Sequence, residues 1–471
     1  MYFLFLAWAS TGIFFIMNII LARILFPADF GIYTLSFTII GIFSMVLGLG
    51  ASLGVIHSDE QKDKLFSTFF FIELITIFIV SALLFCLSRP LANSFGDVRL
   101  ESTLQVLIIF VVSFGFTTIP KTKLLKETQF KKITLIDVFS IFVSVIVSLS
   151  LALTGFGFWS LIIGPLVASL TQAIIYWGLT PIYPKFSQFN FKIFKTLLIF
   201  GLPILISSFV VYLNSHLADV IIAQITGLTF LGYYSLAYNF SNYLATLISD
   251  PVTSALYPVY CEIQKNKDEL RTTFEEHYKM IFVTIIFIAF YILFNAPYAI
   301  SILYGPKWLN SIIILQILII AGLFRALGSI VSNIYLLLNK YYIVLILNSI
   351  FLGLMLPLTI FATIYFGIIG AAAVGSILIV PIITLQYWFL KKYFTFKILK
   401  DSLICLFGCL LTIPPMVIVI YYFNTNPILV LLFNFGIAIS IYLVSINLLT
   451  KGVLTGKLKE MINIFLRKQT S

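Results

Sequence analysis

Long apolar stretches recur along this chain, and the cationic residues between them fall almost entirely on alternate connections. A helix needs about 20 apolar residues to cross the ~30 Å hydrocarbon core of a bilayer, and such stretches recur from residue 3 to residue 448. The strands of a closed barrel, which also satisfies its backbone in lipid, would alternate polar and apolar residues. Segments such as IFVSVIVSLSLAL (141–153) do not alternate. The sequence therefore predicts an all-α polytopic membrane protein.

The composition agrees with this class. Apolar residues make up 61% of the chain, charged residues 10%, and the mean hydropathy is +1.10. Charged residues are about 25% of an ordinary soluble domain. We expect fourteen spans, at 3–24, 31–56, 65–87, 102–120, 133–153, 158–178, 196–215, 228–249, 278–296, 309–337, 342–364, 368–390, 402–422 and 427–448.

The positions of lysine and arginine predict the orientation. With these spans, 24 of the 29 cationic residues lie in one set of alternate connections and in the C-terminal tail. The opposite connections hold only Arg23, Arg89, Arg99 and Lys307. Because connections rich in lysine and arginine stay cytoplasmic, both termini are expected in the cytoplasm. Topology and attraction to anionic lipid explain the net charge of +11 without a nucleic-acid partner.

The chain also contains an internal repeat. Residues 20–37 (ILARILFPADFGIYTLSF) match residues 221–238 (IIAQITGLTFLGYYSLAY) at a constant offset of 201, and Gly31 and Gly232 are one of the identical pairs. Both segments join the first two spans of a half. The pattern indicates that two halves of the chain have related structures.

A second match comes at the end of each half, where TGFGFWSLIIG (154–164) corresponds to YFGIIGAAAVG (365–375). Six spans separate the copies, and six is even, so both halves cross the membrane in the same direction. This arrangement is typical of transporters whose halves rock around a central site. We expect an N-terminal lobe at 1–195, a C-terminal lobe at 196–400, and an appended helix pair with a cytoplasmic tail at 401–471.

Ionisable residues inside the hydrocarbon are costly and are candidates for function. Arg325 lies near the middle of its span, and the planar guanidinium suits a phosphate group. An ion pair with a carboxylate of another helix is the alternative. Glu73 is either functional or the buried partner of a cation. Arg23 and Asp29 flank the first outer turn, where Arg23 could add positive charge and Asp29 could cap the next helix.

Further polar candidates are weaker. Asp137 lies about one turn inside a lysine-rich connection, so it is either a coupling residue or a solvated residue at the membrane interface. His216 and Asp219 share a helix face and could bind a proton or a cation. They do not predict a metal site, because tetrahedral zinc needs at least three protein ligands. Asn239 and Asn242 could line a cavity or form interhelical hydrogen bonds.

Other patterns exclude some chemistry. Cys405 and Cys409 are one turn apart with no histidine or carboxylate beside them, so we expect them to pack. No glycine-rich phosphate loop with a Lys-Ser/Thr end is found, so ATP hydrolysis by that route is not expected. Met1 directly precedes an apolar stretch without the features of a cleaved signal, which predicts either an uncleaved anchor or a start that lacks a short cytoplasmic lead. No cofactor is expected.

Several motifs together resemble a known family. They are ILARILFPADFGIYTLSF (20–37), KLLKETQFKKITLIDVFS (123–140), GFGFWSLIIG (155–164), FGLPILISS (200–208) and LGYYSLAYNFS (231–241). In this order and spacing they are similar to motifs of bacterial Wzx-type polysaccharide flippases. These belong to the multidrug/oligosaccharidyl-lipid/polysaccharide (MOP) exporter superfamily. The resemblance covers about residues 15–450 and points to the colanic-acid or teichuronic-acid export branch.

The resemblance implies two six-helix lobes with two appended helices in the bacterial cytoplasmic membrane. It also implies the translocation of an undecaprenyl-pyrophosphate-linked oligosaccharide by alternating access, for O-antigen, capsule or exopolysaccharide assembly. A polysaccharide polymerase and chain-length machinery are the implied protein partners. No enzymatic activity is implied, and the family pattern assigns no role to single residues here.

Two alternatives stay open. A cation-coupled drug exporter of the same superfamily would need twelve spans and a compact acidic site in one lobe. A membrane enzyme acting on the lipid-linked glycan would need outer loops with histidine, arginine and acidic residues for acid–base work. The short outer connections expected here carry almost none of these.

Overall fold

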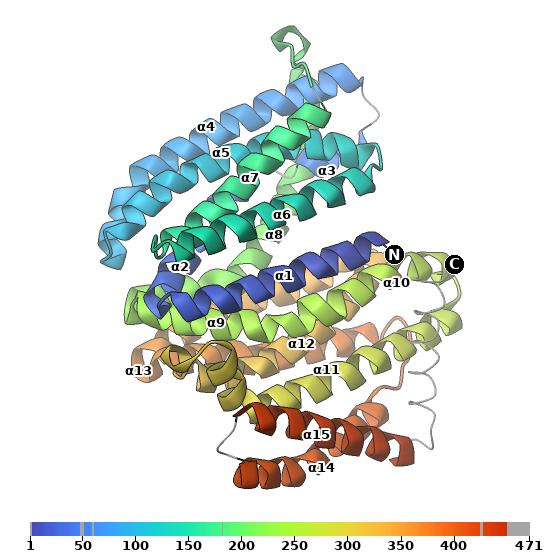
Figure 1. Ribbon diagram of the computed structural model, residues 1–471. Coiled ribbons are helices and arrows are strands. Elements are labelled where there is room, and N and C mark those ends of the chain that lie inside the picture. The colour runs from blue at the N-terminus through green and yellow to red at the C-terminus, as the bar shows by residue number, and fades with distance from the viewer. Residues whose placement is uncertain (1, 48–50, 59–60, 181, 424–426, 450–471) are drawn as a thin grey trace. The chain divides into compact units, whose positions relative to one another are not determined.

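The computed structural model describes residues 2–47, 51–58, 61–180, 182–423 and 427–449, and these residues form helices and connections without any strand (Figure 1). The elements are α1 (Tyr2–Ile24), α2 (Pro27–Ser44), α3 (Ala51–His57), α4 (Lys62–Phe95), α5 (Arg99–Lys126), α6 (Phe130–Leu153), α7 (Trp159–Leu179), η2 (Phe186–Gln188), α8 (Phe191–Thr226), α9 (Leu228–Tyr243), the π-helix η3 (Leu244–Ser249), α10 (Asp250–Ile263), α11 (Lys267–Leu303), η4 (Pro306–Trp308), α12 (Ser311–Leu337), α13 (Tyr341–Leu390), α14 (Leu399–Phe423) and α15 (Pro427–Leu449).

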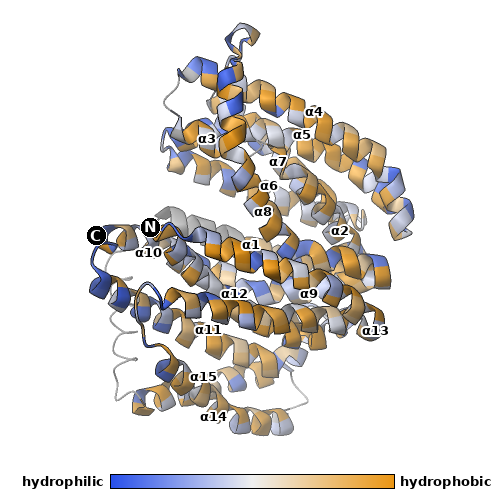
Figure 2. Ribbon diagram, turned by 180° about the vertical axis from the view of Figure 1, so that it is seen from behind, coloured by the Kyte–Doolittle hydropathy of each residue, from blue (hydrophilic) through white to orange (hydrophobic). Residues whose placement is uncertain are grey.

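The predicted fold class is confirmed. Eleven helices of the described chain are long and apolar enough to cross a membrane, judged by length and composition. Hydrophobic residues cover most of the helices, and hydrophilic residues gather toward helix ends and connections (Figure 2). The expected spans 342–364 and 368–390 both lie in α13. The span expected at 31–56 is instead divided between α2 and α3, and that expected at 228–249 runs from α9 into η3.

One glycine separates the two spans within α13. Gly367 has φ 62° and ψ −148°, which no residue of a regular helix adopts. Glycine reaches positive φ without the steric cost that a Cβ atom imposes. The turn therefore forms at YFG, where the sequence predicts a short outer connection.

Side chains set the beginnings of several helices. The Asp29 carboxylate accepts the backbone N–H of Phe26 at 2.9 Å, and Pro27 occupies the first turn of α2. The predicted capping role of Asp29 is therefore confirmed. At the starts of α8 and α11, the side chains of Asn190 and Asn266 each accept two backbone N–H groups. These bonds satisfy donors that a helix start leaves open.

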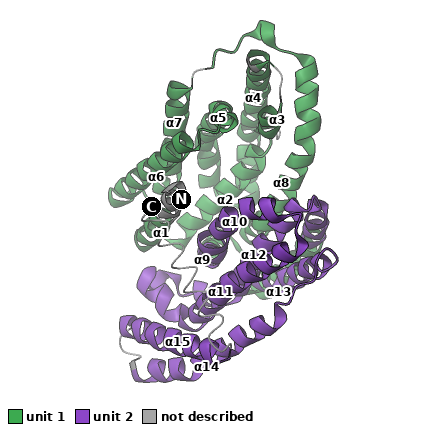
Figure 3. Cartoon of the chain, turned by 90° about the vertical axis from the view of Figure 1, so that its right-hand side faces the viewer, with its two compact units in different colours: residues 1–235, 352–371 green, residues 236–351, 372–471 purple. Residues whose placement is uncertain are grey.

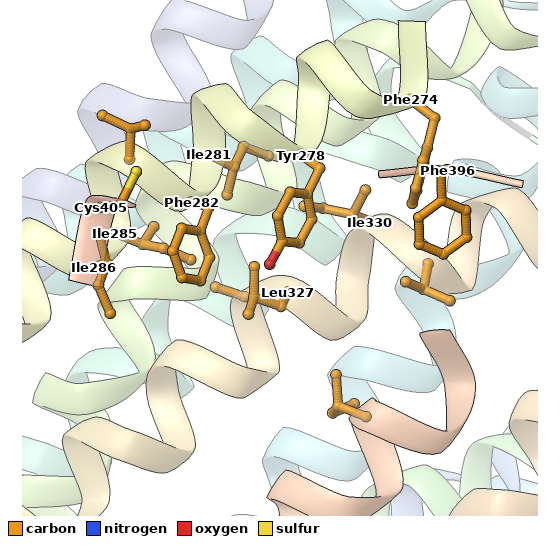
Figure 4. Close-up of a cluster of buried hydrophobic side chains, with 14 of the residues drawn as sticks. Phe274, Tyr278, Ile281, Phe282, Ile285, Ile286, Leu327, Ile330, Phe396 and Cys405 are labelled. Atoms are coloured by element: carbon orange, nitrogen blue, oxygen red, sulfur yellow. The ribbon is translucent and has the colours of Figure 1, made fainter. Parts of the chain in front are cut away.

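The chain divides into two compact units (Figure 3). Unit 1 comprises residues 1–235 and 352–371, and unit 2 comprises residues 236–351 and 372–471. A large buried hydrophobic cluster belongs to unit 2, where Tyr278 and Phe282 of α11 lie beside Leu327 of α12 (Figure 4). Its aromatic and aliphatic side chains join α11 and α12 to α14 and α15.

The last two helices pack on α11 through apolar contacts and a few polar ones. Asn434 of α15 donates a hydrogen bond to the side chain of Asn295 at 2.7 Å, with both side chains fully buried. The Tyr442 hydroxyl donates to the carbonyl of Val283 at 2.8 Å. Interhelical hydrogen bonds of this kind favour one register between helices in lipid. The structure thus joins α14 and α15 to the body of unit 2.

The cysteines expected to pack do so. Cys405 and Cys409 are almost fully buried in the hydrophobic cluster of unit 2 and form no disulfide. They act as small apolar side chains between α14 and its neighbours, as buried cysteines commonly do.

The two copies of the first repeat touch each other inside unit 1. A Cβ atom added to Gly31 would lie less than 3.0 Å from the carbonyl oxygen of Leu228, which is a steric overlap. A Cβ atom added to Gly232 would overlap the carbonyl oxygen of Pro27 in the same way. Gly232 and Leu228 are the repeat equivalents of Gly31 and Pro27 at the offset of 201. The contact between α2 and α9 is therefore reciprocal. It supports the internal repeat and explains why both positions are glycine.

This close approach predicts the effect of adding a methyl group. We expect Gly31→Ala and Gly232→Ala each to destabilise the protein by about 1–3 kcal/mol, because backbone must move to make room. Thermal unfolding of the purified protein in detergent measures the change. Gly436→Ala is the matched control, since Gly436 is also helical and has no atom within 4 Å of an added Cβ. A Gly31→Ala protein that unfolds at the wild-type temperature contradicts the close contact.

Candidate functional site

Arg325 lies in the middle of α12, within unit 2, and stacks on an aromatic ring. Its guanidinium carbon is 4.3 Å from the centroid of the Tyr238 ring on α9. Its Nε donates to the carbonyl of Ala321 at 3.4 Å, and its Nη2 donates to the Ser241 hydroxyl at 3.5 Å. Both bonds are at the long limit for hydrogen bonds. The contact with the face of the Tyr238 ring is therefore the main stabilising interaction of the guanidinium charge.

The alternative of an ion pair is not realised at Arg325. Among residues that the structure describes, no carboxylate oxygen lies within 4.0 Å of its nitrogens. The guanidinium is half-buried, carries a permanent charge and has more N–H donors than these two long bonds use. Such a group can take an anionic ligand.

The helix that faces Arg325 changes its geometry nearby. A Cβ atom on Gly322 would overlap the carbonyl oxygen of Ser241, so glycine lets α12 approach closely one turn before the arginine. The π-helix Leu244–Ser249 begins three residues after Ser241. There the Ser249 hydroxyl bonds to the carbonyl of Ala326 at 2.6 Å. Short π-helical turns are frequent at functional sites.

Of the two asparagines predicted to line a cavity, Asn242 is better placed. It lies one turn after Tyr238 on the same helix face and is half-buried. Asn239 is about 100° around the helix from Tyr238 and is exposed. The structure therefore brings Asn242, and not Asn239, to the face of α9 that carries the arginine's aromatic partner.

A second polar cluster lies within unit 1, between α2 and α8. The Asp219 carboxylate is 2.9 Å from His216 Nδ1 and accepts a hydrogen bond from the Thr38 hydroxyl at 3.2 Å. The Tyr212 hydroxyl donates to the carbonyl of Thr38 at 3.0 Å, and its ring lies 4.4 Å from the His216 ring. The side chain of Asp219 is 5% exposed, whereas that of His216 is 34% exposed. His216 and Asp219 are therefore in contact, and His216 is the more exposed member of the pair.

Sequence reasoning missed two members of this cluster. Tyr212 precedes His216 by four residues and Asp219 by seven, so helical spacing alone could have identified it. Thr38 lies 181 residues away from Asp219 in the chain, and no local pattern points to it. In the same way, nothing in the sequence near Arg325 indicates its partner Tyr238.

The Asp137 carboxylate is paired with a lysine and bonded to a tyrosine hydroxyl. Lys121 of α5 donates to its carboxylate at 2.8 Å, the Tyr176 hydroxyl of α7 donates at 2.9 Å, and Gln172 lies at 3.5 Å. The carboxylate and the ammonium are each about one-third exposed. These bonds join α5, α6 and α7 near the lysine-rich ends of those helices.

Glu73 and Arg23 lie in contrasting environments. Glu73 of α4 is fully buried, and its Oε1 would be 3.2 Å from a Cβ atom on Gly115 of α5. The absence of a side chain at Gly115 thus leaves room for the carboxyl group. Arg23 is exposed at the end of α1. In the described residues no three histidine, cysteine or acidic side chains gather to hold a metal ion.

The fold defines the class of protein. Over 95% of this chain and 99% of the other, the structure is similar to that of lipid II flippase MurJ in an inward closed conformation, with a TM-score of 0.77 and 20% sequence identity. It is also similar to an inward-facing multidrug resistance MATE family transporter of the MOP superfamily, over 80% and 94% of the two chains, with a TM-score of 0.63 and 16% identity. The chain has the fold of MOP-superfamily membrane transporters.

The sequence defines the family. Residues 20–313 match the profile of the polysaccharide biosynthesis protein family, and the chain belongs to that family. It is 28% identical to lipopolysaccharide biosynthesis protein WzxC of Escherichia coli (strain K12) over 67% of this chain and 64% of that protein. An uncharacterized membrane protein in the cps region of Klebsiella pneumoniae is 24% identical over 80% and 78%. Teichuronic acid biosynthesis protein TuaB of Bacillus subtilis (strain 168) is 23% identical over 60% and 59%. The predicted family resemblance is confirmed.

Proposed function

We propose that this protein is a flippase that moves an undecaprenyl-pyrophosphate-linked oligosaccharide across the bacterial cytoplasmic membrane for surface polysaccharide assembly. Membership of the polysaccharide biosynthesis family supports the pathway class. Relatives named as a lipopolysaccharide biosynthesis protein and as a succinoglycan biosynthesis transport protein support transport of glycans. The fold that the chain shares with a lipid II flippase supports a lipid-linked cargo. A polymerase and chain-length machinery are its proposed partners.

The mechanism that we propose is alternating access by two six-helix lobes, at 1–195 and 196–400, with 401–471 as the appended pair and tail. The cargo combines an anionic pyrophosphate, several sugars and a long hydrocarbon tail. A protein that moves it must shield the polar part from hydrocarbon while the tail stays in lipid. A cationic group inside a span would attract the anionic pyrophosphate, and a charge that is costly in hydrocarbon is a candidate for such a function.

Arg325 carries this proposal. It is a permanently charged residue in mid-span, stacked on Tyr238, with no carboxylate partner in the described chain. A guanidinium can donate two parallel hydrogen bonds to a phosphate, which a lysine ammonium cannot do. Asn242 on the same face as Tyr238 would add a neutral donor. Arg23 and Asn239 are proposed to contact the cargo elsewhere along its path, and Glu73 to balance charge.

Substitution of Arg325 tests the role. In a host strain lacking the gene, we expect Arg325→Ala to restore at least tenfold less surface polysaccharide than wild type, because hydrogen bonds to a charged group contribute about 1.5–3 kcal/mol. Arg325→Lys should give an intermediate amount. Tyr238→Phe keeps the stacked ring and should behave as wild type, whereas Tyr238→Ala should not.

Arg271→Ala is the matched control, since Arg271 is a half-buried cation of the same unit that is paired with Glu275. Immunoblots of the membrane fraction verify that every variant is inserted in equal amount. If Arg325→Ala restores as much surface polysaccharide as wild type, Arg325 does not bind the phosphate of the cargo.

We propose that the cluster around Asp219 couples transport to an ion gradient. The nearly buried carboxylate, its contact with His216 and the hydroxyl of Thr38 form an environment that can hold a proton or a small cation. Asp137 is less suited, because its carboxylate is already paired with Lys121. This cluster is also the observation that favours the second candidate, a cation-coupled exporter of small molecules.

Transport into inverted membrane vesicles distinguishes these cases. We expect collapse of the proton and sodium gradients to stop translocation of the lipid-linked glycan, and Asp219→Asn to lower it in energised vesicles. Asp268→Asn, an exposed change at the start of α11, should have no effect. Undiminished flipping without any gradient excludes ion coupling. Export of small organic cations together with no glycan translocation would favour the second candidate.

The proposed orientation places lysine-rich connections and both termini in the cytoplasm. Ser94 and Ser187 are exposed and lie in connections expected on opposite sides. In a variant without the natural cysteines, we expect a membrane-impermeant maleimide to label Ser94→Cys in intact spheroplasts. Ser187→Cys should react only after permeabilisation. The reverse pattern means that the orientation is inverted.

A further inference from the structure

Unit 1 has an apolar groove between α4, α5 and α7. It has a volume of about 530 Å³, within the range of about 300–1,000 Å³ typical of small-molecule sites. Its walls include Phe70 of α4, Ile109 and Phe116 of α5, and Ile174 and Trp177 of α7, with Pro184 at one end. The hydroxyl of the lining Ser113 is bonded to Ser169 at 2.7 Å, so the groove presents hydrocarbon.

Aromatic packing holds the groove in shape. The Trp177 ring meets Phe70 and Phe116 edge to face, with centroids 6.2 and 6.3 Å apart. Its Nε1–H donates to the carbonyl of Phe116 at 2.9 Å. Because the indole is fixed by a hydrogen bond and by two rings, the wall that it forms exists before any ligand arrives.

The segment that follows the lining residue Pro184 is anchored to α4. The backbone N–H of Lys185 donates to the Ser67 hydroxyl at 3.3 Å, and that hydroxyl donates to the side chain of Gln188 at 3.0 Å. The backbone N–H of Asn190 donates to the Thr68 hydroxyl at 3.1 Å. The segment is thus fixed in place next to the groove.

Positive charge lies at this same end. The Lys185 side chain is exposed and directly follows the lining residue Pro184. On α5, Lys123 lies two turns beyond Phe116 on the same helix face. Two other lysines of α5 are held by different groups, since Lys121 is paired with Asp137 and the Lys126 ammonium bonds to the carbonyls of Val55 and Ser58. An apolar groove that ends at a lysine matches a molecule with an anionic head and a hydrocarbon chain.

We propose that this groove binds one acyl chain of an anionic phospholipid, with the lipid phosphate next to Lys185. Ile174 is 73% exposed and Ile109 is 48% exposed, so the groove is open along its side. From Ile109 to Phe116 it extends about 10 Å along α5, at ~1.5 Å per residue. That length suits part of one acyl chain better than a polyprenyl tail. Basic pockets between membrane helices are known to select anionic lipids.

Fluorescence quenching tests the site in the complete protein, reconstituted into nanodiscs. The probes are phosphatidylglycerol and phosphatidylcholine with brominated acyl chains, and the difference from Trp177→Phe isolates the signal of Trp177. We expect brominated phosphatidylglycerol to quench Trp177 at a roughly fivefold lower mole fraction, the preference that one lysine near an anionic headgroup gives. Lys185→Glu should abolish this preference without changing the fold, since its side chain is exposed.

A second variant tests the groove itself. Ala173→Phe should fill it and lower quenching by both lipids, while Ile146→Phe, at a 63% exposed position of α6, should leave quenching unchanged. Equal quenching by both lipids with no effect of Lys185→Glu overturns the proposal. Displacement of brominated phosphatidylglycerol by undecaprenyl phosphate at lower concentration than by unbrominated phosphatidylglycerol also overturns it, and assigns the groove to a prenyl chain. Neither result depends on whether the protein transports a glycan.

Discussion

Every part of this structure depends on the need to satisfy backbone polar groups where no water is present. In hydrocarbon each N–H and C=O must bond within the protein, and helices do so within one segment. The same need extends to side chains. Hydroxyl groups such as those of Thr76, Thr117 and Ser140 bond to the carbonyl four residues earlier. Polar residues therefore remain inside spans at little cost, and the few that bond to another helix stand out.

Close helix crossings are the second requirement, because apolar side chains gain little by leaving lipid for a protein contact. Small residues let backbones approach and gain dispersion energy. Gly31 and Gly232 provide such a crossing for the two copies of the repeat, and Gly322 provides another beside Arg325. In each case the atom that a Cβ would overlap is a backbone carbonyl oxygen. The crossings thus join secondary structure directly to secondary structure, with no side chain between them.

Asp137, Asp219 and Arg325 are supported within their spans in two different ways. Asp137 is paired with Lys121 of α5, and Asp219 accepts a hydrogen bond from Thr38 of α2, so both carboxylates tie their helices to a neighbour. Arg325 is supported by the face of an aromatic ring and by two long hydrogen bonds. A cation held by a ring keeps its capacity for an anion, because the ring attracts the charge without using the N–H donors. This difference underlies the separate roles that we propose for Arg325 and Asp219.

The sequence by itself determined the helical membrane fold, the positions of most spans, the repeat at an offset of 201 and the cap at Asp29. These depend on hydrophobic length, on local spacing and on residues within one turn of each other. Only the tertiary structure decided that Tyr238 supports Arg325, that Thr38 bonds to Asp219 and that Trp177 forms one wall of a groove. It also decided the division of one expected span between α2 and α3 and the π-helix after α9. Partners tens to nearly two hundred residues apart leave no local pattern, since helix packing alone sets which faces meet.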